Sequence, residues 1–126
     1  MESQANLYEG FKDPQYMRVS VNKNGKFLSP QRSQKVRNHS PDGFSWGYGG
    51  SGPAQLALAI LLEEYDEKTA LYYYQDFKWE VIANLPQSCN WSLDSQTIAK
   101  IMKRMIEAEE LHLEAEREDD HEEVQR

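Results

Sequence analysis

The sequence predicts an α+β fold, in which a small antiparallel sheet is followed by about three helices and one buried helix lies at the centre. Three observations predict it. Residues 16–28 alternate and turn as a hairpin does, and residues 53–65 are apolar on nearly every side. Two later segments repeat apolar residues at spacings of three or four. A chain of 126 residues has the size of one domain, so we expect one shared core.

The charge divides the chain into a compact domain, residues 1–106, and an acidic tail, residues 107–126. The tail carries ten acidic and two basic residues, whereas the first 106 residues carry eleven and twelve, and the total is −7. Residues 14–41 contain six basic residues and no acidic one. Helix-favouring Glu, Ala and Leu continue into the tail while the apolar stripe fades. We therefore expect the tail to be partly helical and partly disordered.

The N-terminal region predicts the sheet. Residues 7–11 resemble a short strand, and residues 16–21 alternate between apolar and polar side chains. Residues 22–25, Asn-Lys-Asn-Gly, predict a turn because Asn and Gly tolerate the positive φ of a tight hairpin. Residues 26–28 would then be the returning strand. Residues 31–45 have no clear period, and we expect a loop or a short strand there.

The central helix is expected at 53–65. Pro53 suits the first turn of a helix, and Ser51 or Gly52 would be its N-cap. Because apolar residues lie on nearly every side, this helix should be buried. Asp66 can cap a second helix, which Pro86 ends. The buried face of that helix is predicted to contain Ala70, Tyr74, Phe77, Val81 and Ile82.

A loop is expected after the second helix, with Trp91 and Leu93 filling the core. Asp94 or Ser95 would then cap a third helix. Its apolar stripe contains Ile98, Ile101, Met102, Met105 and Ala108.

Several classes of protein are disfavoured. The longest apolar run, 56–62, is far shorter than the ~20 residues that cross a membrane. No charged and apolar leader opens the chain, so we expect no secretory signal. Cys89 is the only cysteine, which excludes an internal disulfide and fits a reducing cytoplasm. We therefore expect a cytoplasmic protein that has no contact with a membrane.

Glycines at 47, 49 and 52 match the G-x-G-x-x-G pattern of dinucleotide-binding proteins. That fold needs a second parallel strand after the helix, and residues 66–85 predict another helix instead. A phosphate-binding Walker loop is excluded as well, because no Lys-Ser or Lys-Thr follows these glycines. A nucleophile elbow would need a glycine at Pro53.

Two interpretations of the glycine-rich turn at 47–53 remain. The first, which we favour, is that the glycines allow a sharp turn and pack Trp46 and Tyr48 against the central helix. We expect Trp46 to be buried, whereas Tyr48 is evenly balanced between core and surface. The second is that free N–H groups at the helix start bind an anion beside the basic stretch. The candidate ligand- or partner-binding residues are Arg37, Asn38, His39, Trp46, Tyr48, Gly49, Gly50 and Ser51.

Catalysis, metals and nucleic acid have little support in the sequence. His39, His112 and His121 are scattered, and a single cysteine excludes the usual zinc sites, so we expect no metal and no cofactor. No residue is assigned as catalytic, and a small enzyme that uses Ser51, His39 or Tyr48 is the weakest alternative. The basic stretch lies on expected strands and a loop, and it contains no helix that could enter a DNA groove. The acidic tail would also repel a polyanion, so we regard nucleic acid as an unlikely partner.

The segment GFSWGYGGSGPAQLALAIL, residues 43–61, resembles the hallmark of a small family of unknown function found in bacteria, phages and plasmids. The resemblance extends from about Leu7 to about Ile101. Ser45 stands where an acidic residue is expected, and the acidic tail lies beyond the usual end. Further matches are Tyr8-x-Gly10, Asn38-His39-Ser40-Pro41, Phe77-Lys78, Ile82, Leu85-Pro86 and Trp91-x-Leu93.

This resemblance implies no established activity. It implies a mobile-element setting, in which small accessory proteins often bind host defence or replication factors. We therefore predict a non-catalytic binding protein with a protein partner, modulating a host defence or replication protein. The alternative is a protein that binds a nucleotide or another phosphorylated small molecule at the 47–53 turn. The oligomeric state is left open.

Overall fold

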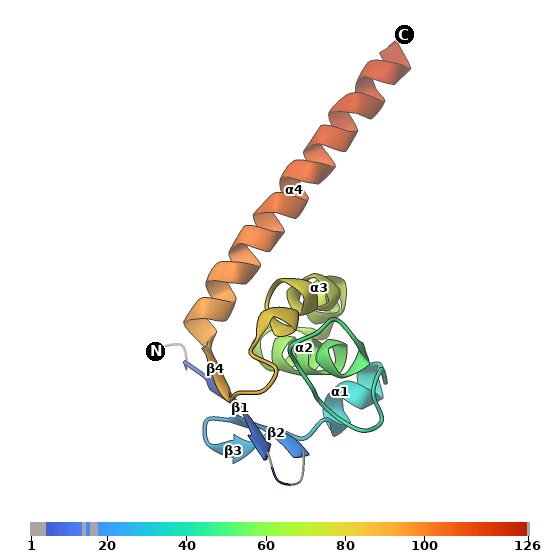
Figure 1. Cartoon of the computed structure of the whole chain (residues 1–126). Coiled ribbons are helices and arrows are strands. Elements are labelled where there is room, and N and C mark those ends of the chain that lie inside the picture. Colours follow the sequence, from blue (N-terminus) through green and yellow to red (C-terminus); the bar gives the residue numbers. More distant parts are fainter. Residues whose placement is uncertain (1–4, 14, 16–17, 126) are drawn as a thin grey trace. The chain divides into compact units, whose positions relative to one another are not determined.

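The computed structural model describes residues 5–13, 15 and 18–125, and it confirms the α+β class (Figure 1). Residue contacts divide the chain into two units, Met1–Ser95 and Gln96–Arg126. The elements of the first unit are β1 (Leu7–Asp13), β2 (Arg18–Lys23), β3 (Lys26–Phe27), α1 (Gln31–Val36), α2 (Ser51–Glu64), α3 (Glu67–Glu80), the 3-10 helix η1 (Ile82–Asn84) and β4 (Trp91–Asp94). The second unit consists of the helix α4 (Ser95–Gln125) from Gln96 onward.

The sheet has four antiparallel strands in the order β3-β2-β1-β4. Its last strand corrects an expectation, because Trp91 and Leu93 were placed in a loop. Both are buried as predicted, but they belong to β4, where Trp91 pairs with Gly10 and Leu93 with Tyr8. Trp-Ser-Leu-Asp alternates with a period of two, so both apolar side chains face the core when the segment pairs with the edge of β1.

The hairpin between β2 and β3 confirms the predicted turn, in a tighter form. Asn24 and Gly25 have φ of 53° and 80°, the positive values of a two-residue hairpin loop. Asn22 and Lys23 were assigned to the turn, but they belong to β2 and pair with β1. The predicted strand began at residue 16, and residues 16–17 lie outside the described part of the chain.

The helix α2 is the centre of the core, as predicted. Every residue from 52 to 62 is buried, which agrees with the apolar side chains on nearly every side of the helix. The helix begins at Ser51, two residues before the expected start, and Gly50 is its N-cap. No side chain caps this end, so the predicted caps Ser51 and Gly52 are both wrong.

The helix α3 has its predicted start but ends earlier than predicted, at Glu80 instead of Pro86, and Val81 and the 3-10 helix η1 follow it. The carboxylate of Asp66 accepts a hydrogen bond from the backbone N–H of Thr69 at 3.2 Å, so Asp66 is the N-cap. At the other end, the Asn84 amide donates to the carbonyls of Trp79 and Glu80. All five residues predicted for its buried face are buried: Ala70, Tyr74, Phe77, Val81 and Ile82.

The segment 31–36 was expected to be loop or strand, and that expectation is wrong because it forms α1. The helix starts at the Pro30 carbonyl, which accepts from the backbone N–H of Gln34 and from the hydroxyl of Ser33. Six residues are too few to display an apolar period, and the residue that α1 buries is the polar Ser33.

The helix α4 begins at Ser95, directly after Asp94, which is one of the two predicted caps, and continues to Gln125. Its second half therefore contains the acidic residues of the tail in helical form. Within the part of the chain that the structure describes, no helix is both long and apolar enough to span a lipid bilayer.

Candidate functional site

The side chain of Gln55 joins the loop before the glycine-rich turn to α2 through hydrogen bonds. Its amide is fully buried one helical turn after the start of α2 and makes four hydrogen bonds. The Oε1 atom accepts from the backbone N–H groups of His39 at 2.7 Å and Ser40 at 3.0 Å. The Nε2 atom donates to Ser33 Oγ at 2.9 Å and to the Arg37 carbonyl at 3.1 Å. These bonds place His39 beside the first turns of α2.

His39 is joined to α3 by a short hydrogen bond. Its Nε2 atom lies 2.6 Å from the hydroxyl of Tyr74, which is buried on α3. Partial burial lowers the pKa of His39, and the positive charges of Arg37 and Lys78 lower it further. We call Arg37, His39, Tyr74 and Lys78 the His39 cluster.

The His39 cluster contains two permanent cations, Arg37 and Lys78. Lys78 is only 7% exposed, and Arg37 is exposed. Among the described residues, neither side chain forms a salt bridge with a carboxylate. Within the described part of the chain, the cluster therefore carries two positive charges that no salt bridge neutralises.

Trp46 is a core residue, as predicted. It is 3% exposed, and its indole N–H donates to the Pro86 carbonyl at 3.1 Å. Its ring meets that of Trp91 edge to face, with centroids 5.5 Å apart, a favourable geometry for aromatic pairs. Trp46 thus anchors the start of the glycine-rich turn in the core, and it is not exposed to a ligand.

Tyr48 lies at the surface; the sequence had left its position open between core and surface. Its side chain is 47% exposed, and its hydroxyl lies 2.8 Å from Ser45 Oγ. A Cβ atom at Gly50 would overlap the Tyr48 ring, so this ring packs directly against the backbone of the turn. Ser51 follows as the exposed first residue of α2.

Gly49 supports an exposed tryptophan of α3. A Cβ atom at this position would overlap the ring of Trp79, so the indole rests directly on the backbone of Gly49. The ammonium group of Lys78 lies 4.3 Å from the centroid of the same ring, a cation–π contact. Trp79 is nevertheless 59% exposed. We call Tyr48, Gly49, Lys78 and Trp79 the Trp79 surface.

The predicted site residues therefore separate into two groups. Arg37 and His39 belong to the His39 cluster, and Tyr48 and Gly49 belong to the Trp79 surface. Lys78 belongs to both, so α3 joins the two regions. Of the remaining candidates, Asn38 is exposed in the loop, Gly50 and Ser51 begin α2, and Trp46 lies in the core.

Four residues that form or support these two regions were missing from the predicted site residues: Gln55, Tyr74, Lys78 and Trp79. A signal existed for Gln55, because it is a polar residue in the first half of an otherwise apolar helix. A signal also existed for Trp79, which lies seven residues after Tyr72 and therefore on the same exposed face of α3. The contact between Gly49 and Trp79 could not be predicted, because the two residues lie far apart in the sequence and no local pattern links them.

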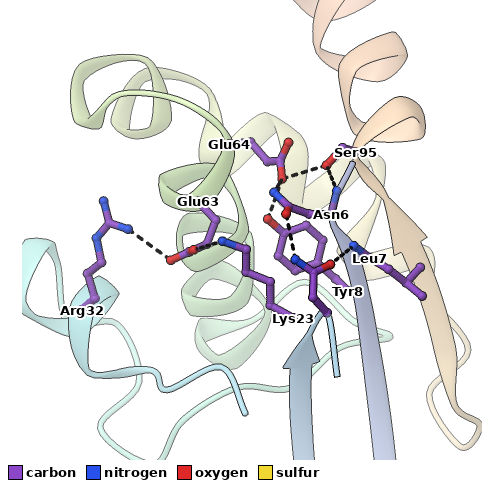
Figure 2. A network of polar contacts seen from close by, with 9 residues as sticks. Asn6, Leu7, Tyr8, Lys23, Arg32, Glu63, Glu64 and Ser95 are labelled. Atoms are coloured by element: carbon purple, nitrogen blue, oxygen red, sulfur yellow. Dashed lines mark hydrogen bonds and ion pairs between the residues drawn. The ribbon is translucent and has the colours of Figure 1, made fainter. Parts of the chain in front are cut away.

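A second polar cluster surrounds the carboxylate of Glu64 at the end of α2 (Figure 2). One oxygen, Oε2, accepts from Tyr8 Oη at 2.6 Å, Asn6 Nδ2 at 2.7 Å and Ser95 Oγ at 3.0 Å. Burial, followed by the bond to Glu64, raises the pKa of the Tyr8 phenol above its ordinary range. The carboxylate of Glu64 thus accepts three hydrogen bonds, and the one from Tyr8 joins β1 to the end of α2.

The neighbouring carboxylate, Glu63, joins α2 to two other elements (Figure 2). It pairs with Lys23 of β2 at 2.6 Å and with Arg32 of α1 at 3.1 Å. Of the six basic residues within residues 14–41, Lys23 and Arg32 are thus neutralised by Glu63. Arg37, which belongs to the His39 cluster, forms no salt bridge with a carboxylate of the described residues.

Metal chemistry receives no support from the described residues, in which no group of three potential ligands lies together. His112 pairs with Glu116 along α4 at 3.1 Å. The arrangement of the first unit suits recognition through an aromatic ring and fixed positive charge.

The comparisons with known proteins identify the family and nothing further. A model described as "Family of unknown function (DUF6166)" matches residues 8–104. This range agrees with the resemblance noted from about residue 7 to about residue 101. No curated protein and no solved structure matches the chain. Because the match covers more than half of its residues, the chain belongs to this family of unknown function.

Proposed function

We propose that this chain is a non-catalytic binding protein whose protein partner docks on the Trp79 surface. The observation that carries the proposal is the state of Trp79, whose ring is 59% exposed yet rests on Gly49 and carries the Lys78 ammonium. Exposing a large aromatic side chain to water forgoes the free energy of burying it. Tryptophan is also among the residues that dominate binding energy at protein interfaces.

The fixed position of the ring favours this role. A side chain that is already ordered loses less conformational entropy when a partner covers it. Gly49 gives the indole a flat support, and Tyr48 adds a second exposed aromatic ring from the same turn. An aromatic pair beside a lysine has the composition of an interface centre with a polar rim.

Catalysis is a weaker candidate on the same residues. The Nε2 atom of His39 is occupied by Tyr74, and the hydroxyl of Tyr48 by Ser45. A general base or nucleophile needs its reactive atom within reach of a substrate. The mobile-element setting implied by the resemblance favours a host defence or replication protein as the partner.

The proposal is tested by affinity capture from a host lysate with three tagged forms of the full chain. These are the wild type, Trp79→Ala, and Phe27→Ala as the matched control. Phe27 is 69% exposed on β3, so its removal also deletes an exposed aromatic ring but leaves the Trp79 surface unchanged.

We expect the wild type and Phe27→Ala to retain the same protein and Trp79→Ala to lose it. Truncation of a central interface tryptophan typically costs ~2 kcal/mol or more, or about thirtyfold in affinity. Equal capture by all three forms would place the interface elsewhere. Loss in Phe27→Ala alone would also contradict the proposal.

A further inference from the structure

The strand β2 is only partly covered on the side of β3. The short β3 pairs with the last two residues of β2, and the N–H of Leu28 then donates to the Val21 carbonyl at 2.8 Å. Pro30 follows as the N-cap of α1, so the chain leaves the sheet after Leu28. In the described part of the chain, no strand pairs with residues 18–20 on this side of β2. We call this open segment the β2 edge.

Val19 directs its backbone donor and acceptor toward the β2 edge. Along a central antiparallel strand, successive residues bond alternately to the two neighbouring strands. The Val21 carbonyl bonds to Leu28 on the β3 side, and Val19 lies two residues away, so it faces the same side. Lys12, which lies opposite Val19 on β1, gives its N–H to the side chain of Asn90 at 3.1 Å, on the side of β4. The N–H and C=O of Val19 are therefore placed to bond with a further strand.

A cavity of about 150 Å³ lies beside the β2 edge. Its apolar walls include Val19 and Val21 of β2, Leu28 and Pro30 after β3, and Phe44 of the loop before the glycine-rich turn. Residues opposite each other in a sheet point to the same face, so a residue paired with Val19 would direct its side chain to the face of Val21 and Leu28. An apolar cavity of ~150 Å³ holds a molecule of the size of benzene. This cavity therefore has room for one aliphatic side chain.

The charge around the β2 edge indicates what binds there. Arg18 is exposed at the start of β2 and forms no salt bridge with a described carboxylate, and residues 14–41 contain six basic residues and no acidic one. Two copies joined through their β2 edges would bring these like charges together, which is unfavourable. Asp13 lies opposite Arg18 on β1, and Asp42 lines the cavity, so an acidic residue of a partner is expected on the open side of Arg18. The charge thus favours an acidic segment of another protein.

We propose that the β2 edge binds an extended peptide segment of a partner protein as an added strand, with an aliphatic side chain in the cavity and an adjacent acidic side chain opposite Arg18. Binding of this kind takes its affinity from main-chain hydrogen bonds and its specificity from side-chain pockets. A short edge strand and a charged residue would alone suffice to keep two copies from pairing, but such protection needs no cavity. The β2 edge shares no residue with the Trp79 surface, so this inference goes beyond the proposed function and does not depend on it.

The test begins with the selection of peptides from a random heptapeptide library displayed on phage, with the immobilised full chain as the target. We expect enrichment of an aliphatic residue that has an acidic residue next to it. The same selection with Arg18→Glu should enrich a basic residue at that place, because Arg18 is exposed and its replacement reverses the charge of the edge. Enrichment of no common pattern, or of the same acidic pattern by Arg18→Glu, would overturn the proposal.

A synthetic peptide of the enriched sequence is then titrated into the ¹⁵N-labelled full chain. In the saturated complex, the Val19 amide should exchange with solvent about tenfold more slowly, because its N–H gains an acceptor. Val19→Pro removes this N–H without removing a bond to β1 and should weaken binding about tenfold, whereas the control Trp79→Ala should change the affinity less than about twofold. If Val19→Pro does not fold, Val19→Phe decides, because its larger side chain fills part of the cavity. Unchanged affinity in a folded Val19 variant, or an unprotected Val19 amide, would refute the site.

Discussion

Replacement of Gln55 by leucine should destabilise the protein by about 2–4 kcal/mol. The variant keeps nearly the same volume in the fully buried position and removes all four hydrogen bonds of the amide. The N–H groups of His39 and Ser40 then lack their acceptor. Each unsatisfied buried donor costs ~1–3 kcal/mol, and the lower values apply here because the loop is partly open to water.

Two further terms modify this estimate. The Arg37 carbonyl and the Ser33 hydroxyl also lose a donor, at ~1 kcal/mol each. Leucine recovers about 1–2 kcal/mol through its larger apolar surface. The net loss therefore remains near the stated range, and it is a large part of the ~5–15 kcal/mol that stabilises a typical domain.

The assay is urea unfolding followed by tryptophan fluorescence, with Gln75→Leu as the control. Gln75 is exposed on α3, so its replacement should change the free energy of unfolding by no more than ~0.5 kcal/mol. Gln55→Leu should lower the unfolding midpoint at an unchanged m-value. If Gln55→Leu lowered the free energy of unfolding by less than about 1 kcal/mol, the hydrogen bonds of Gln55 would not be what holds this loop against α2.

Three further predictions concern the fold and the titration of His39. Tyr8→Phe should cost about 1.5–3 kcal/mol in urea unfolding, because the Glu64 carboxylate loses a 2.6 Å donor; a neutral result would make that bond dispensable. Gly25→Ala should cost about 1 kcal/mol through its φ of 80°, and a stabilised variant would contradict the turn geometry. Because the pKa of His39 is lowered, the unfolded chain takes up the proton more readily. Its contribution to stability is therefore complete above about pH 6.5 and declines as the pH falls below that value. In His39→Gln, the free energy of unfolding should decline less between about pH 7.5 and 5.5 than in the wild type. Parallel curves of this free energy against pH for the two proteins would contradict the lowered pKa of His39.

Much of the fold was predictable because the determinants are local. Asp66 caps α3 through its own first turn, and Asn24-Gly25 turns the hairpin with two residues. The apolar residues of α2 occupy all sides of the helix, which predicted its central place. By contrast, α1 is held by Pro30 and by the amide of Gln55 from α2, and β4 exists because β1 offers it an edge. Such long-range partners leave no period in the sequence.

About half of the residues of the candidate site could be selected from the sequence. Arg37 and His39 were selected because basic residues adjoin a turn that precedes a helix, and Tyr48 because it lies among glycines. Lys78 and Trp79 were missed, because α3 was interpreted through its buried face alone. The glycines pack against aromatic rings, Gly49 against Trp79 and Gly50 against Tyr48. Their contact with a ring that remains exposed to water depends on the tertiary approach of α3.

The central claim is that Trp79 is a preformed binding element, held in place before any partner arrives. The most direct measurement is ¹⁵N relaxation of the Trp79 indole N–H in the full chain, compared with Gly49→Ala. We predict a wild-type order parameter near that of rigid backbone, about 0.85, and a clear decrease when the added methyl displaces the ring. A wild-type value below about 0.6 would contradict the claim, because the ring would then be a mobile surface side chain.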